Sequence, residues 1–226
     1  MGIISLNKAS RLYWLGRYSE RVYTGLKEVK PIYDSSVDGS EADFTSYCRK
    51  LGVPCDYQNT ADFCKRYFFD RNNPNSLAAS LVYAYDNAIV LRDTLTTDTL
   101  SYIFMAISAM EKASESDTPG VQLQWVLDDI LAFRGSCEET IYDEEIRSMI
   151  KLGVSVERVD IYLRLGEEPE KTRREFERLF NRLYKTQLQP DKRRLEFLVD
   201  AILDSSKPDA TSYEMVGALE GLFLDL

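Results

Sequence analysis

A short charged motif occurs twice in the sequence. Segment 15–22 reads LGRYSERV and segment 152–159 reads LGVSVERV, so both copies follow the pattern L-G-x-x-x-E-R-V. Arginine binds carboxylate and phosphate groups through its planar guanidinium, and glutamate can take part in acid–base chemistry. The motif therefore provides the candidate site residues, which are Arg17, Glu20, Arg21, Glu157 and Arg158.

The composition restricts the chemistry that such a site could perform. The 226-residue chain contains no histidine, which excludes Ser/His/Asp and Cys/His nucleophilic sets, His-ligated zinc or haem, and Glu-x-x-His di-iron sites. The formal net charge of −9 argues against nucleic acid as the main partner, because phosphate binding needs a positive field. We assign no metal and no cofactor from the sequence.

One carboxylate spacing keeps a magnesium alternative open. Glu157 and Asp160 have the E-x-x-D spacing with which helical nucleotide pyrophosphohydrolases hold Mg²⁺ through oxygen ligands. The second carboxylate pair that such a site requires is only loosely available, as Glu167 and Glu170 on either side of a glycine break. Mg²⁺ therefore belongs to the alternative hypothesis of an enzyme.

Apolar periodicity and Gly/Pro punctuation predict helices along the whole chain. No stretch shows the sustained period-two alternation of a strand. The expected fold is an all-α bundle of about nine to ten helices. The predicted ranges are Lys8–Val29, Glu41–Leu51, Ala61–Phe69, Ser76–Leu95, Thr99–Glu115, Val121–Tyr142, Glu144–Leu165, Pro169–Leu188, Lys192–Leu203 and Tyr213–Leu224.

The two motif copies lie inside two of the long predicted helices. Glycine within a helix costs about 1 kcal/mol relative to alanine, so Gly16 and Gly153 predict close helix approach. Repetition of the motif suggests an internal pseudo-two-fold packing of the two long E-R helices. We expect a single domain over residues 1–226, with 118–120 as the best candidate for an internal boundary.

The second motif helix is apolar on two sides. Its main stripe runs from Met149 to Leu163, and the opposite face, which carries Glu157, also carries Ile150, Val154 and Ile161. A helix of this kind is expected to be central, so Glu157 should be largely removed from water. Burying an unpaired carboxylate costs several kcal/mol, and Glu157 therefore requires a partner.

The motif itself offers that partner, but not at the neighbouring position. Adjacent residues on a helix do not face each other, so Arg158 is not expected to satisfy Glu157. We predict that Glu157 pairs with Arg21 or Arg17, and that Glu20 pairs with Arg158. Two interpretations follow: a buried ion-pair lattice that sets helix register, or a polar pocket whose arginines bind a ligand carboxylate or phosphate. A water-filled pocket against these guanidinium groups would favour the second.

Further features bear on location and partners. The sequence has no apolar stretch of membrane-spanning length and no signal peptide, so we expect a cytoplasmic protein without a membrane partner. Four cysteines without C-x-x-C spacing are expected to be reduced thiols. One face of the predicted helix from Pro169 is basic, and we expect either a solvated stripe or a docking surface for an acidic partner. The stripe consists of Lys171, Arg174, Arg178, Arg182 and Lys185.

The sequence resembles the bacterial Alpha-E family, named for an α-helical domain with an E-R motif. The resemblance lies in the run 9–21, ASRLYWLGRYSER, in the second LGxxxER, and in the segments NSL at 75–77, DNA at 86–88 and RD at 92–93. It implies a genomic neighbourhood with ATP-grasp-type amide ligases and transglutaminase-like cysteine hydrolases, and a role in making or modifying peptides. The second copy departs from the first by having Val154 in place of Arg17, which argues against two equivalent sites.

From this resemblance and the absence of a nucleophile–base set, we expect a non-catalytic accessory or peptide-binding protein. Its expected partner is an ATP-grasp-type ligase or a transglutaminase-like protein. The alternative is an enzyme of peptide or phosphate chemistry that uses Glu20, Glu157 and the neighbouring arginines, with Mg²⁺ as a cofactor. The sequence leaves the oligomeric state open.

Overall fold

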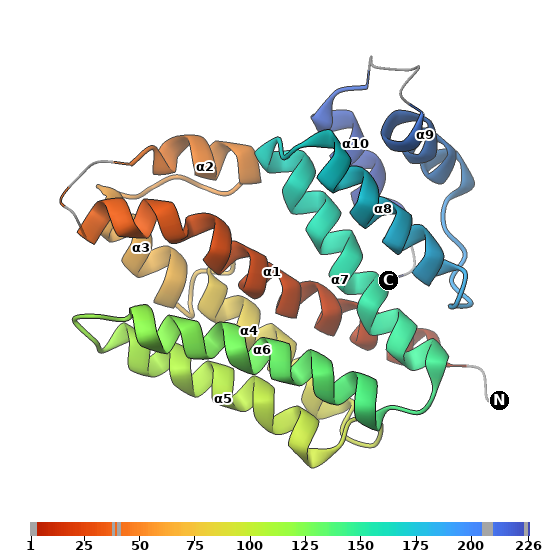
Figure 1. Ribbon diagram of the computed structural model, residues 1–226, viewed down its shortest axis with the longest axis horizontal. Helices are drawn as coiled ribbons and strands as arrows, with labels where there is room; N and C mark the ends of the chain where they lie inside the picture. The colour runs from red at the N-terminus through yellow and green to blue at the C-terminus, as the bar shows by residue number, and fades with distance from the viewer. Residues whose placement is uncertain (1–3, 38, 40–41, 205–209, 224–225) are drawn as a thin grey trace. The chain divides into compact units, whose positions relative to one another are not determined.

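The fold is built from helices alone in the part of the chain that the structure describes. A computed structural model describes residues 4–37, 39, 42–204, 210–223 and 226. These residues form ten helices and no strand (Figure 1), which confirms the all-α prediction. The helices are α1 (Leu6–Val37), α2 (Phe44–Leu51), α3 (Thr60–Phe69), α4 (Leu77–Val90), α5 (Thr97–Ser114), α6 (Gly120–Thr140), α7 (Glu144–Leu165), α8 (Pro169–Leu183), α9 (Lys192–Leu203) and α10 (Ser212–Glu220).

The helices gather into two compact units. The first unit consists of Met1–Arg17 with Asp143–Leu226, and the second of Tyr18–Tyr142. Helix α1 contributes its beginning to the first unit and its remainder to the second. Residues 118–120 lie within the second unit, at the turn between α5 and α6. The single domain and the pseudo-two-fold relation of the two E-R helices stay predictions.

Helix α7 is the centre of the first unit. It packs against α8 and α10, and it buries residues all around its axis, as its two apolar faces predict. The start of α1 crosses α7 at two glycines. A Cβ added at Gly16 would overlap the carbonyl oxygen of Ile150, and one added at Gly153 would overlap that of Tyr13. The predicted close approach at both glycines is therefore confirmed.

The second unit is organised around the α5–α6 hairpin. Helix α4 packs on α5, and α3 packs on both α4 and α5. Its largest fully buried side chains form a core of aromatic and aliphatic groups. They are Phe63, Phe68, Leu77, Leu81, Ile103, Ile130 and Phe133.

Most helix boundaries follow local signals in the sequence. Helices α7 and α9 have the predicted bounds, and α7 ends at Gly166, whose φ of 75° is left-handed. Ser76 caps α4 by accepting from the Ala79 amide, and Asn59 caps α3 by accepting from the Asp62 amide. The predicted start at Glu41 and end at Leu224 lie outside the described residues.

Two predicted helix ends are wrong for physical reasons. Helix α1 was expected to stop before Pro31 but continues to Val37. Proline removes a single amide donor, and the continuing turn is supported by Ser35 Oγ, which donates to the Pro31 carbonyl at 2.9 Å, and by Tyr33 against Phe68. Helix α4 ends at Val90 instead of Leu95, because the following residues form a tight turn in which the Thr94 amide donates to the Leu91 carbonyl.

The remaining differences concern length. Helix α8 ends at Leu183 and α10 at Glu220, each a few residues earlier than predicted.

Within the described residues, no helix combines the length and the apolar character that crossing a membrane would require.

Candidate functional site

The first motif arginine and the second motif glutamate form a buried ion pair in the first unit. Arg17 Nε donates to Glu157 Oε2 at 2.7 Å, and the two side chains are 10% and 2% exposed. Of the two partners predicted for Glu157, the structure therefore selects Arg17. The guanidinium also lies 5.0 Å from the centroid of the Trp14 ring, which adds a cation–π contact.

The pair holds Arg17 as a permanent cation. Burial by itself would lower the pKa of Arg17, but attraction to Glu157, Tyr13 and Asp160 outweighs it and raises the pKa overall. A guanidinium in this state cannot serve as a proton donor near neutral pH, so its role is electrostatic.

A second carboxylate lies one helical turn beyond Glu157. Arg164 Nε donates to Asp160 Oδ2 at 2.9 Å, while Asp160 Oδ1 is buried without a hydrogen-bond partner among the described residues. Burial and the nearby Glu157 raise the pKa of Asp160, although Arg164 and Arg17 oppose the shift. The ionised form of the Asp160 carboxylate is therefore disfavoured in its position beside the Arg17–Glu157 pair.

The magnesium alternative finds no ligand set here. Among the described residues, no group of three or more His, Cys, Asp or Glu side chains is arranged to hold a metal ion. The two glutamates that could have completed the set are engaged in ion pairs on α8. Glu167 pairs with Lys171 at 2.8 Å and Glu170 with Arg174 at 3.0 Å.

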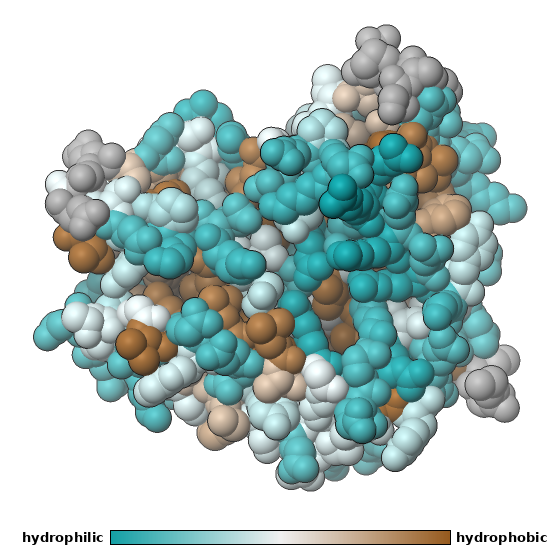
Figure 2. Space-filling model, viewed as in Figure 1, coloured by the Kyte–Doolittle hydropathy of each residue, from teal (hydrophilic) through white to brown (hydrophobic). Residues whose placement is uncertain are grey.

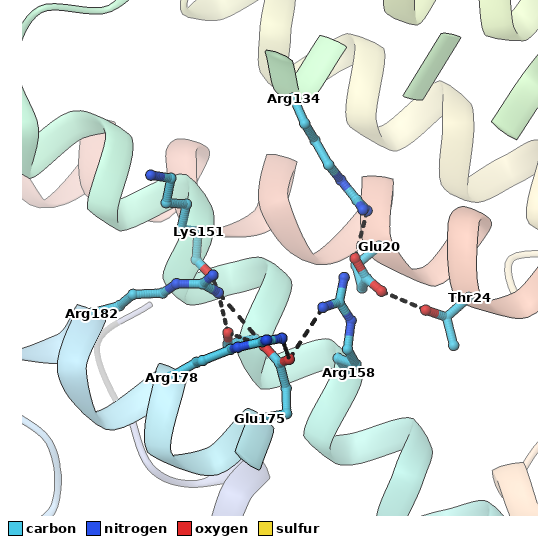
Figure 3. A network of polar contacts seen from close by, with 9 residues as sticks. Glu20, Thr24, Arg134, Lys151, Arg158, Glu175, Arg178 and Arg182 are labelled. Atoms are coloured by element: carbon cyan, nitrogen blue, oxygen red, sulfur yellow. Dashed lines mark hydrogen bonds and ion pairs between the residues drawn. The ribbon is translucent and has the colours of Figure 1, made fainter. Parts of the chain in front are cut away.

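Glu20, the glutamate of the first motif copy, lies in the second unit. It is fully buried, and it accepts from Arg134 Nη2 at 2.5 Å and from the Thr24 hydroxyl (Figure 3). Sequence reasoning missed Arg134. A signal was present, because Arg134 is the only basic residue of the α6 sequence and lies next to the apolar Phe133. The pairing predicted between Glu20 and Arg158 joins the two units and stays a prediction.

Arg21 also belongs to the second unit and contacts aromatic rings. Its guanidinium carbon lies 5.6 Å from the centroid of the Tyr18 ring. Its positive charge also acts on the buried Tyr67 hydroxyl, where it opposes the effect of burial on the pKa. Arg21 and Arg17 are four residues apart, yet they have different surroundings.

Arg158 is directed at a buried carboxylate on α8 in the first unit. Its Nη1 donates to Glu175 Oε2 at 3.2 Å, and the same carboxylate accepts from Arg178 at 3.0 Å (Figure 3). The carboxylate also accepts from Ser155 Oγ at 2.5 Å. Arg182 Nη1 lies 3.7 Å from Glu175 and donates to the Lys151 carbonyl. Two of the arginines that the sequence assigned to the basic stripe therefore contact a buried group.

Glu175 is the second residue that sequence reasoning missed. It lies on the apolar stripe of α8, between Thr172 and Leu179, and only about 2% of it is exposed. An acidic residue on an apolar stripe indicates a buried carboxylate that needs partners, and this signal could have identified it.

The positive charges of the basic stripe are paired with carboxylates to a greater extent than the sequence implies. Each of its five residues has a carboxylate within ion-pair distance in the first unit, and Lys185, for example, pairs with Glu144 at 2.7 Å. Figure 2 shows the area over α8 as almost entirely hydrophilic. The exposed pairs of Lys171, Arg174 and Lys185 contribute about 0–1 kcal/mol each. Arg178 and Arg182 share the buried Glu175, so the stripe is largely neutralised.

Four cavities of the described residues have no motif residue in their linings, and their volumes are about 40, 100, 160 and 300 Å³. Within each unit the motif charges make ion-pair contacts: Arg17 with Glu157, Glu20 with Arg134, and Arg158 with Glu175. These contacts favour the interpretation of the motif as a lattice that holds helices together.

Comparison with known proteins agrees with the motif. A family model described as a predicted alpha-helical domain with a conserved ER motif matches residues 7–210. A search of curated proteins and a search of solved structures each found no match. The matched range contains both motif copies, the eight complete helices α2 to α9, and α1 apart from its first residue.

Proposed function

We propose that this chain, which belongs to the Alpha-E family, is a non-catalytic accessory protein that works with an ATP-grasp-type amide ligase or a related peptide-modifying system. The observation that carries the proposal is the buried Arg17–Glu157 pair. The charged groups that define the motif are satisfied inside the protein, so they are available for holding helices rather than for turning over a substrate.

The state of these groups also argues against acid–base catalysis. A general acid or base must come within hydrogen-bond reach of a substrate and exchange a proton near the working pH. Glu157 is 2% exposed and is bonded to a permanent cation, and Glu20 is fully buried beneath Arg134. Access to either carboxylate would require the ion pair to open, which costs several kcal/mol.

The link to a ligase rests on the family resemblance. The proposed accessory role requires a surface that binds a partner enzyme or its peptide, and a preorganised surface lowers the cost of that binding. The helical units provide such surfaces. A transglutaminase-like hydrolase is the other partner class that the resemblance implies.

A reconstituted assay tests the proposal. A purified ATP-grasp-type ligase from the same organism would be assayed for ADP release with its peptide substrate, with and without this chain. We expect the chain alone to release no ADP, and to change the rate of the ligase when it is added. Thermal-shift measurements with nucleotides, Mg²⁺ and short peptides would run in parallel.

The alternative of an enzyme makes the opposite prediction. If the chain alone consumes ATP or cleaves peptide with Mg²⁺, and if Glu157→Gln abolishes that turnover at an unchanged melting temperature, the accessory role is wrong. If the same variant instead loses stability, while the residual folded protein still acts on the ligase, the structural role of the motif is supported.

A further inference from the structure

The α5–α6 hairpin exposes large apolar side chains to solvent. Met105 on α5 and Trp125 on α6 are 49% and 48% exposed, and both are of a size that proteins usually bury. Apolar residues are visible among hydrophilic ones along α6 in Figure 2. Other exposed large apolar residues of this hairpin are Phe104, Val121 and Leu131. Of these five residues, Met105 and Trp125 lie together, and exposed apolar side chains that lie together mark interaction surfaces.

Met105 and Trp125 line a groove between the two helices. The groove has a volume of about 300 Å³ and lies entirely within the second unit. Its α6 wall carries Asp128 and Asp129 one turn beyond Trp125, because residues three and four apart share a helix face. The groove therefore combines an aromatic ring, a flexible thioether side chain, two carboxylates on its α6 wall and the Lys112 ammonium group on its α5 wall.

The two carboxylates have no cationic partner in the described residues. Asp128 Oδ1 accepts from Gln124 Nε2 at 2.9 Å, and no Lys or Arg of the described chain lies within 4.0 Å of either aspartate. Partial burial and the neighbouring Asp128 raise the pKa of Asp129.

The charge of the hairpin as a whole has the same sign. Residues 97–140 contain eight acidic and two basic residues, so this segment carries −6 of the formal −9 of the chain. One of the two basic residues, Arg134, is bonded to the buried Glu20. The other, Lys112, lines the groove, but the two carboxylates leave the net charge of the lining negative, so the groove attracts cations and repels phosphate and acidic surfaces.

We propose that this groove docks a basic, apolar segment of a partner polypeptide. An Arg or Lys side chain of that segment lies against the Trp125 ring, with its charge facing Asp128 and Asp129, and a neighbouring apolar side chain covers Met105. Tryptophan is the aromatic residue that binds cations best, and pairs of aromatic and arginine side chains are common at the centres of interfaces. A small amine alone would leave Met105 uncovered, which is why a polypeptide is the occupant.

Because the groove contains no motif residue, its binding property is independent of the accessory role proposed above. A basic segment on a ligase would join the two proposals, but either can fail without the other. The assay described above addresses the role of the whole chain, and the peptide titrations below address the groove.

Fluorescence anisotropy with labelled synthetic peptides tests the groove. The main probe is an amphipathic peptide with Arg and Leu on one helical face. Two further probes replace every Arg by Glu, or every Leu by Ser. We expect the Arg/Leu peptide to bind with saturation, the Glu/Leu peptide not to bind, and the Arg/Ser peptide to bind about tenfold more weakly, corresponding to the loss of the apolar contacts.

Matched variants assign the binding to the groove. Trp125→Ser and the double variant Asp128→Asn/Asp129→Asn should each weaken the Arg/Leu peptide by about tenfold or more. The control Asp98→Asn/Glu139→Gln removes the same number of exposed charges from the same hairpin, outside the groove lining, and should bind within about twofold of the original chain. The substituted side chains are all partly or fully exposed, and thermal melts would verify that the variants fold.

Several results would overturn the proposal. If the Arg/Leu peptide does not bind, or if the control weakens it as much as the groove variants, no specific docking site exists. If the Glu/Leu peptide binds equally well, the carboxylates play no part. If spermidine displaces the probe completely, and the Arg/Ser peptide binds as tightly as the Arg/Leu peptide, the groove is a site for free polyamine rather than for a polypeptide.

Discussion

Gly16 and Gly153 each lie against the backbone of the helix that carries the other. Gly16 faces Ile150, three residues before Gly153, and Gly153 faces Tyr13, three residues before Gly16. This reciprocal contact brings the start of α1 and α7 to backbone distance. It also places Arg17, the residue after Gly16, at 2.7 Å from Glu157. The glycines of the motif therefore set the spacing that its charges require.

Replacing either glycine by alanine should destabilise the protein. In an exposed helix position Gly→Ala is favourable by about 0.5–1 kcal/mol, but at Gly153 the new methyl would overlap the Tyr13 carbonyl oxygen. We expect Gly153→Ala to lower the free energy of unfolding by about 1–3 kcal/mol, as overpacking does. Urea unfolding followed by circular dichroism measures the difference.

A matched control exists on α6. A Cβ added at Gly135 meets nothing within 4 Å, so Gly135→Ala should be neutral or stabilising. Equal stability of Gly153→Ala and the original chain would mean that the close helix crossing is absent in solution.

The losses of stability caused by substituting Arg17 and Glu157 should not be additive, because the two side chains form a buried ion pair. Glu157→Gln leaves the Arg17 cation buried without its anion and should cost about 3–5 kcal/mol. Arg17→Met leaves the carboxylate uncompensated and should cost a similar amount. The double variant Arg17→Met/Glu157→Met removes both charges and should recover much of the loss, since apolar replacements of buried pairs are often tolerated.

Urea unfolding of the four proteins completes the double-mutant cycle. An exposed carboxylate such as that of Glu139 provides the control, and Glu139→Gln should change stability by less than about 0.5 kcal/mol. Additive losses in the double variant would show that Arg17 and Glu157 are not coupled.

Replacing Asp160 by asparagine should maintain or raise the stability of the protein at neutral pH. The pKa of this acid is raised in the folded protein by burial and by Glu157, so its ionisation opposes folding above the folded pKa. The penalty grows as the pH rises from the unfolded pKa near 3.8 toward the raised folded pKa, and it disappears as the pH falls below the unfolded value. Asp160→Asn removes the penalty but keeps a hydrogen-bonding acceptor for Arg164. We expect this variant to be as stable as the original chain or more stable at about pH 7.

The pH dependence separates this cause from a change in packing. The difference between Asp160→Asn and the original chain, measured by urea unfolding, should shrink between about pH 7 and pH 4. A difference that is constant over this range, or a loss of stability comparable to that of Glu157→Gln, would contradict the assigned cause.

The cysteines should react in two classes. Cys55 is exposed, whereas Cys48, Cys64 and Cys137 are buried, and all four are free thiols, as the sequence predicted. Burial raises the pKa of Cys48 to about 12 and that of Cys64 to about 11, so little thiolate forms near neutral pH. A disulfide reagent should modify one thiol rapidly in the native protein and all four after denaturation.

Removal of the exposed thiol checks the assignment. Cys55→Ser should abolish the fast phase and leave the slow phase unchanged. A fast phase that persists in this variant would mean that a buried cysteine is accessible, and the packing of α2 and α3 around Cys48 and Cys64 would then need revision.

The accuracy of the sequence predictions depends on whether the signal was local. The bounds of α7 follow from apolar periodicity and from Gly166, whose left-handed φ ends the helix. Pro31 is the counterexample. The rule that proline ends a helix predicts an end there, but α1 continues because the loss of one backbone hydrogen bond is offset by packing and by the Ser35 hydroxyl. Local rules set the number and type of the helices, while packing shifted several ends.

At the candidate site, the sequence predicted which residue needs a charged partner better than it predicted which residue is that partner. The burial of Glu157 and its need for an arginine followed from the two apolar faces of its helix. Arg17 and Arg21 lie four residues apart, so periodicity alone could not choose between them. Arg134 and Glu175 were missed because their partners come from other helices, although each had a local signal.

By itself, the sequence determined an all-helical chain, two glycines at close helix contacts and a carboxylate that needs a buried cation. Only the tertiary structure decided that the cation is Arg17, that Glu20 accepts from Arg134, and that a carboxylate-lined groove opens between α5 and α6. The physical reason is the range of the interactions. Helix periodicity and capping depend on residues within about one turn, whereas an ion pair or a groove depends on distances between helices that only their packing sets.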